Sequence, residues 1–138
     1  MSRRLLAIGL ASIVVGVTML ALDLTWLGLV ARKVYDEAMG PLKRPDIQLL
    51  PATLFYALYV LAIVVHAVIP SGTPGQALRR GAGLGLVAYA TYDLTCWAVI
   101  VGWPVHLVPI DLGWGVLLTS VVSWVGRSVY QRFDVSTA

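Results

Sequence analysis

Hydrophobic residues occur in long blocks along this chain, and short stretches with polar residues, glycine and proline separate the blocks. Four blocks have the length that a bilayer crossing requires, about 20 apolar residues. They cover residues 5–31, 50–69, 81–101 and 110–125. A soluble core helix would show polar residues at every third or fourth position, and these blocks do not. The pattern predicts an all-α, integral membrane four-helix bundle, with one transmembrane domain over residues 1–138.

Composition and charge agree with a membrane protein. Hydrophobic residues make up 59% of the 138 positions and charged residues 12%, against about 25% charged in a typical soluble domain. The net charge of +3 is spread over the ends of the blocks, which indicates contact with anionic membrane lipid and not with nucleic acid. One side of the predicted membrane carries more basic residues, which predicts that both termini are cytoplasmic. That side has Arg3, Arg4, Arg79, Arg80, Arg127 and Arg132, and the other has Arg32, Lys33, Lys43 and Arg44.

The connections between blocks contain helix-boundary signals. Residues 32–39 extend the first helix until Gly40 and Pro41 stop it. Asp46 is the predicted N-cap of the second helix. Thr73-Pro74-Gly75-Gln76 has the form of a capping box, so the third helix is predicted to begin near Pro74. Gly81 and Gly85 are four residues apart, a spacing that lets another helix approach closely.

Three aspartates interrupt the apolar blocks: Asp23, Asp93 and Asp111. A carboxylate in hydrocarbon costs roughly 2.5–3.5 kcal/mol at a helix centre, so such residues usually face a partner or a wet cavity. Asp23 and Asp93 occur in the same tripeptide, Asp-Leu-Thr, 70 residues apart. The repeat is consistent with two tandem helical hairpins related by an axis along the membrane normal. Identity between the two halves is otherwise low.

Residues three or four apart share a helix face, so each aspartate has aromatic neighbours. With cytoplasmic termini, all three acids lie in the outer half of the bilayer, level with Tyr56. The predicted feature is a polar pocket open to the outside. Its candidate binding residues are Asp23, Asp93, Tyr56, Tyr89, Tyr92, Trp26, Trp97 and Asp111. Two of the carboxylates could share a proton or bind a cation, because like charges held close together do not both ionise cheaply.

Structural explanations compete with a binding role for these acids. Asp23 and Asp93 could instead bond to neighbouring helices and lock the bundle. Asp111 is predicted in the first turn of the fourth helix, where the helix dipole alone stabilises an acid. The hydroxyl groups of Thr25 and Thr95 are predicted to bond to backbone carbonyls in the preceding turn.

Two segments resemble a known family. Ala21-Leu22-Asp23-Leu24-Thr25-Trp26-Leu27-Gly28 and the segment from Tyr89 to Thr95 are similar to motifs of a family of small bacterial predicted membrane proteins of unknown function. The turn Gly102-Trp103-Pro104 and the segment 111–115 also look like that family's second half. The resemblance implies a four-helix protein of the bacterial inner (plasma) membrane, and it implies no activity.

Three hypotheses for the function remain open. The first is a transport or binding protein for a small molecule or ion, with Asp23 and Asp93 as a proton- or cation-linked pair and a homodimer as the working unit. The second is a membrane-embedded enzyme of lipid or isoprenoid metabolism, with an aspartate as general acid. The third is an accessory subunit that packs against another membrane protein. Enzyme activity is the less favoured, and no metal or cofactor is expected, because the chain has no phosphate-binding glycine loop and no H-E-x-x-H pair.

Overall fold

The computed structural model describes residues 3–134, and within that range it contains five α-helices and no strand. The helices are α1 (Arg3–Thr25), α2 (Arg32–Met39), α3 (Leu49–Ile63), α4 (Pro74–Val99) and α5 (Leu107–Phe133). π-helical segments prolong α1 over Trp26–Val30 and α3 over Val64–Val68, and a 3₁₀ turn, Gly40–Leu42, follows α2. The all-α prediction is confirmed. The helix count differs from four because residues 32–39 form a separate short helix after Ala31.

Three helical segments are long and apolar enough to cross a membrane. They are Arg3–Val30, Leu49–Val68 and Leu107–Phe133, so the third of these extends well beyond the predicted block 110–125. The predicted block 81–101 lies in α4, which is 26 residues long but is not among the three. Its glycines, its tyrosines and Asp93 lower its hydropathy. Length and composition therefore support three spans where the block pattern predicted four.

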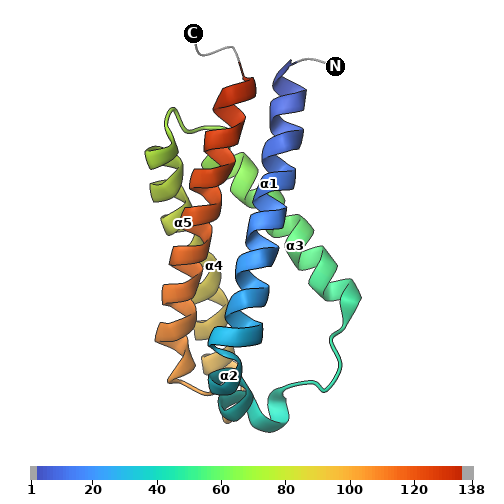
Figure 1. Ribbon diagram of the computed structural model, residues 1–138. Helices are drawn as coiled ribbons and strands as arrows, with labels where there is room; N and C mark the ends of the chain where they lie inside the picture. The colour runs from blue at the N-terminus through green and yellow to red at the C-terminus, as the bar shows by residue number, and fades with distance from the viewer. Residues whose placement is uncertain (1–2, 135–138) are drawn as a thin grey trace.

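Helices α1, α4 and α5 run roughly along one axis, and α3 crosses them at a slant (Figure 1). The chain reverses direction between successive long helices (Figure 1). Both termini consequently lie at one end of the bundle, and α2 lies at the other (Figure 1). Helix α5 is central, because α4 packs along its length and α1 packs against another side. Helix α3 is peripheral and contacts the rest mainly through Val64–Val68. In an apolar 18-residue stretch of each span, 44% of the residues are buried in α5 and 17% in the α3 span, which agrees with these positions.

Glycines allow α4 and α5 to approach closely. A methyl group on Gly81 would overlap Ser123 of α5, and one on Gly85 would overlap the carbonyl of Gly115. The predicted small-residue face of Gly81 and Gly85 is therefore confirmed as a helix contact. This close approach brings the Asp93 end of α4 next to the Asp111 end of α5.

The core of the bundle lies between α1, α5 and the end of α3. Helix α1 contributes a buried stripe with a spacing of four residues, as expected for one helix face. The buried core residues are Ala7, Ala11, Val15, Met19, Tyr59, Ile63, Val64, Val68, Leu118, Val122 and Tyr130. The candidate site lies at the end of the bundle opposite the termini.

The predicted helix boundaries are partly correct. The Thr73 hydroxyl accepts a hydrogen bond from the Gln76 amide at 3.2 Å, so the predicted cap of α4 is confirmed. The Gln76 side chain bonds to the Gly72 amide, one residue before the position in a standard capping box. The prediction that Asp46 caps the second helix is wrong, because α3 begins at Leu49 after Gln48 and has no side-chain cap.

A buried arginine connects the helices at the end of the bundle that carries the termini. Arg127 of α5 donates to the carbonyls of Val68 and Gly72, at 3.5 and 3.3 Å. These carbonyls lie at and just beyond the end of the α3 helix, where backbone acceptors have no helical partner. Arg127 therefore fixes the well-packed end of α3, while the first turns of α3 remain loosely packed.

Candidate functional site

A cavity of about 390 Å³ lies near the α2 end of the bundle. All five helices contribute to its lining. The lining residues are Asp23, Leu27, Tyr35, Phe55, Tyr56, Tyr89, Tyr92, Asp93, Asp111 and Trp114. Six of the eight predicted site residues are among these ten. Asp23, Asp93 and Asp111, which are far apart in the sequence, therefore line one cavity.

Asp23 is held by two hydrogen bonds from other helices. One carboxylate oxygen accepts from the Tyr56 hydroxyl of α3 at 3.0 Å. The other accepts from the indole N–H of Trp114 in α5, also at 3.0 Å. Asp23 therefore connects α1, α3 and α5. This is the structural alternative from the sequence analysis, in which the acid bonds to neighbouring helices and locks the bundle. The Thr25 hydroxyl donates to the Ala21 carbonyl at 2.8 Å, as predicted, and does not take part in the cavity.

Asp111 accepts a hydrogen bond from the hydroxyl of Tyr35. Tyr35 belongs to α2, so this contact joins the short helix to the bundle. The prediction that Asp111 lies in the first turn of its helix is wrong, because α5 begins at Leu107 and Asp111 follows that turn. Its partner is therefore a side chain of another helix.

Asp93 is fully buried, and within residues 3–134 neither of its carboxylate oxygens has a hydrogen-bond partner. A buried polar group without a partner costs about 1–3 kcal/mol in protein mutational data, and an unpaired charge costs more. Asp93 nevertheless lines the same cavity as Asp23 and Asp111. Asp23 and Asp93 each begin a copy of the tripeptide Asp-Leu-Thr, but their surroundings differ. Asp23 accepts two hydrogen bonds, and Asp93 accepts none from the described residues.

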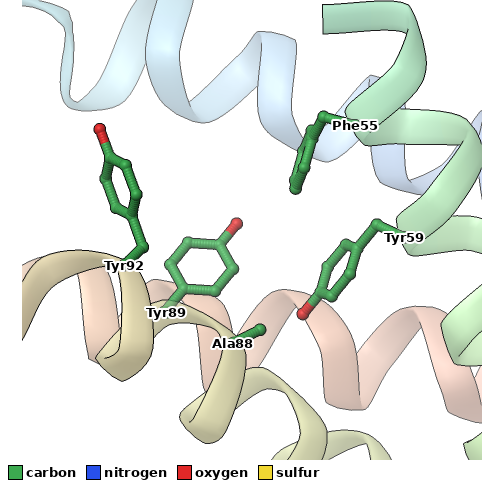
Figure 2. A pocket seen from close by; sticks show the side chains of 5 residues that line it. All are labelled: Phe55, Tyr59, Ala88, Tyr89 and Tyr92. Carbon is green, nitrogen blue, oxygen red and sulfur yellow. The ribbon is translucent and has the colours of Figure 1, made fainter. Parts of the chain in front are cut away.

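The position of Tyr89 depends on a glycine in the neighbouring helix. A methyl group on Gly115 of α5 would overlap the ring of Tyr89. Deeper in the bundle, the Tyr59 hydroxyl and the Thr119 hydroxyl are 2.7 Å apart and share a hydrogen bond. Tyr59 and Phe55 of α3 face Tyr89 and Tyr92 of α4 across a gap (Figure 2).

Two predicted site residues do not line the cavity. Trp26 stacks on Trp114, with ring centroids 4.5 Å apart. It therefore contacts a lining residue without lining the cavity itself. Its indole N–H is buried and has no partner in the described part of the chain. Trp97 is about half exposed and lies in the last turn of α4. Tyr89 and Trp97 lie on opposite sides of Asp93, about 40° each way around the helix. The Tyr89 side contacts Gly115 of α5, and the Trp97 side is half exposed.

Sequence reasoning missed three aromatic residues of the site: Tyr35, Phe55 and Trp114. Trp114 follows Asp111 by one helical turn, and Phe55 adjoins Tyr56, so local signals existed for both. Nothing local links Trp114 to Asp23, which is 91 residues away. Tyr35 gave no signal, because its role depends on α2 folding back beneath the bundle.

The charged residues of α2 are engaged with one another beside the cavity. Arg32 pairs with Asp36 and Lys33 with Glu37, each at 3.7 Å. Lys43 donates a hydrogen bond to Asp36 as well, and this bond, with the positive charges of Lys43 and Arg32, lowers the pKa of Asp36 despite partial desolvation. None of the ten described residues that line the cavity is Lys, Arg or His. The cavity is therefore acidic and aromatic.

No three His, Cys, Asp or Glu side chains of residues 3–134 come together as ligands for one metal ion. The fold and the cavity define a helical membrane protein with an acidic, aromatic pocket among its helices. The chain belongs to the family described as "Predicted membrane protein (DUF2177)", whose model matches residues 8–128. The resemblance found in the sequence is thus confirmed at the level of the family. No curated protein and no solved structure matches the chain.

Proposed function

We propose that α4 is a fourth membrane span and that the protein lies in a bacterial inner membrane with both termini in the cytoplasm. Helix α4 has 26 residues, which at 1.5 Å per residue extend about 39 Å, against a hydrocarbon core of about 30 Å. It packs along α5, one of the three apolar spans. The excess of arginines at the end with the termini supports the orientation.

Cysteine labelling tests this topology. In a Cys96→Ser background, a membrane-impermeant maleimide added to intact spheroplasts is expected to label Glu37→Cys in α2 and not Gln131→Cys in α5. Both substitutions leave the number of basic residues unchanged. Labelling of Gln131→Cys alone would reverse the orientation, and equal labelling of both from outside would contradict an even number of spans.

For the function, we propose a membrane transport or binding protein that holds a small molecule or ion in the acidic pocket. Occupancy of the pocket is coupled to a proton or cation at Asp93. The observation that carries this proposal is the Asp93 carboxyl group, which is buried, has no hydrogen-bond partner among residues 3–134 and lines the cavity. Such a group is costly unless a proton or a cation neutralises it.

The two acids of the Asp-Leu-Thr tripeptides divide the work in this proposal. Asp23 accepts two hydrogen bonds and holds α1, α3 and α5 around the pocket. Asp93 exchanges the proton or cation, because no donor in the described chain competes for it. The other titratable groups that face Asp93 across the cavity are Asp23 of α1, Tyr35 of α2, Tyr56 of α3, Tyr89 and Tyr92 of α4, and Asp111 of α5.

The π-helical segment Trp26–Val30 lends further support. It begins directly after the first Asp-Leu-Thr tripeptide, and its Leu27 lines the cavity. Single π-helical turns within α-helices occur frequently at functional sites.

Proton exchange in proteoliposomes tests the function. Vesicles that contain the full-length chain and an internal pH-sensitive dye are challenged with K⁺, Na⁺, ethylammonium or tetraphenylphosphonium under an imposed pH gradient. Wild-type protein is expected to exchange protons for at least one of these cations, and Asp93→Asn is expected to abolish the exchange. Asp36→Asn in α2 is the matched control, because Asp36 pairs with Lys43 and Arg32 outside the cavity.

Two results would contradict the proposed function. One is an absence of proton exchange with every cation in wild-type vesicles, together with no cation binding in equilibrium measurements. The other is exchange by Asp93→Asn at the wild-type rate. Matching gel-filtration profiles before reconstitution, and equal amounts of protein in the vesicles afterwards, exclude misfolding as the cause of a loss.

A further inference from the structure

The acidic pocket adjoins an apolar opening on the side of the bundle. This opening, of about 420 Å³, lies between α3 and α4 and is lined by Phe55, Tyr59, Ala88, Tyr89 and Tyr92 (Figure 2). Phe55, Tyr89 and Tyr92 also line the acidic pocket, so the two spaces meet at these rings. The lining residues belong to helix interiors and not to loops, so the opening faces sideways.

The packing of α3 explains why the opening exists. Helix α3 is held through Val64–Val68, and its first turns diverge from the bundle (Figure 1). Large apolar side chains on these turns are exposed, including Leu50, Leu54 and Leu58. Since Leu49–Val68 is a candidate membrane span, these side chains are expected to face lipid. The apolar opening lies beside them and next to the acidic pocket.

The groups at the inner end of the opening favour a positive charge. Three carboxylates line the pocket, and none of its described lining residues is basic. Asp23 and Asp111 already accept hydrogen bonds, so Asp93 is the one of the three acids that has no partner in the described part of the chain. One unpartnered carboxylate suits one positive charge. Tyr89, Tyr92 and Phe55 add ring faces, which attract cations over distances of about 6 Å.

We propose that the ligand of this pocket is a lipophilic organic cation, an ammonium or phosphonium ion with aromatic or alkyl substituents, which arrives from the bilayer between α3 and α4. The charged centre pairs with Asp93, and the substituents lie against Phe55, Tyr89 and Tyr92. This inference rests on the proposed function, because it names the class of molecule that the same pocket takes. An apolar lateral opening does not favour small inorganic cations, because its lining offers them few polar ligands. Anions would be repelled by the carboxylates of the pocket.

Equilibrium binding of matched probes tests the ligand class. Full-length protein in lipid nanodiscs is titrated with tetraphenylphosphonium, with its anionic counterpart tetraphenylborate and with tetramethylammonium, each corrected for uptake by empty nanodiscs. Tetraphenylphosphonium is expected to bind at least about tenfold more tightly than either of the others, because it alone combines the charge with the apolar body.

Two variants locate the binding. Asp93→Asn is expected to weaken tetraphenylphosphonium binding by about tenfold or more, since it removes the charge that pairs with the ligand. Ala88→Phe leaves Asp93 in place and fills the opening, so it is expected to slow or weaken binding as well. Asp36→Asn, in α2, is the control that should bind as wild type does.

The outcomes separate this inference from the proposed function. Equal binding of the phosphonium and borate ions, or unchanged binding in Asp93→Asn, would overturn the inference. If K⁺ or ethylammonium exchanges for protons through Asp93 and tetraphenylphosphonium does not bind, the proposed function stands and the ligand class is wrong. If tetraphenylphosphonium binds through Asp93 without proton exchange, the ligand class stands and the coupling fails.

Discussion

Asp93→Leu is expected to raise the free energy of unfolding by about 1–3 kcal/mol, because it removes a buried carboxyl group that accepts no hydrogen bond from the described residues. The adjoining cavity of about 390 Å³ can accommodate the larger side chain. Asp23→Leu is expected to have the opposite effect, a loss of about 1–3 kcal/mol, because the Tyr56 hydroxyl and the Trp114 indole lose their acceptor. Reversible unfolding in mixed detergent micelles measures both changes.

The sign of the Asp93 effect distinguishes a functional acid from a structural one. A residue kept for its chemistry costs stability, whereas a residue that locks the bundle adds to it. Thr91→Leu is the control, because Thr91 is an exposed residue of the same helix and should change stability by less than about 0.5 kcal/mol. If Asp93→Leu destabilises the protein as much as Asp23→Leu does, Asp93 is structural and the proposed function loses its main support.

Gly115→Leu is expected to destabilise the protein by about 1–3 kcal/mol or more, because its side chain would occupy the space of the Tyr89 ring and force α4 away from α5. Gly113→Leu should not destabilise it, and the better helix propensity of leucine favours a small gain. Gly113 is an exposed glycine of the same helix, and a methyl group there would meet no atom within 4 Å. Unfolding in mixed micelles compares the two variants.

A second substitution makes this test sharper. Tyr89→Ala in the Gly115→Leu background removes the ring that the new side chain strikes, so the double variant is expected to be more stable than the two single losses predict. Simple additivity of the two losses would show that Gly115 and Tyr89 do not oppose one another. Because Tyr89 lines both the pocket and the lateral opening, Gly115→Leu is also expected to weaken tetraphenylphosphonium binding.

Some local features of the fold followed directly from local chemistry. Thr73 caps α4 because a hydroxyl before Pro74 can accept from the first-turn amide of Gln76, and this depends on a few adjacent residues. Gly81 and Gly85 predicted a close helix contact for a similar reason, since their spacing fixes a shared face. Asp46 failed as a cap because the chain remains irregular until Leu49, beyond the reach of its side chain.

The candidate site was predicted less completely. Spacing along one helix placed Tyr89 and Asp93 together, but the same spacing also suggested Trp97, which lies on the other side of Asp93 and is half exposed. Trp114, which holds Asp23, belongs to a helix 91 residues away. Sequence spacing shows which residues share a helix face. It does not show which helix packs against that face, because this depends on how the whole bundle packs.

By itself the sequence determined that this protein is helical, that it has membrane-length apolar segments and that three acids interrupt them, because segment length and polarity are properties of the chain alone. The two Asp-Leu-Thr tripeptides are identical in sequence, and only the tertiary structure decided that one acid is bonded and the other is not. The physical reason is that the donors for Asp23 come from α3 and α5, whereas no donor of the described chain reaches Asp93. The lateral opening between α3 and α4 is also a tertiary feature, because it exists where α3, held mainly through Val64–Val68, diverges from the bundle.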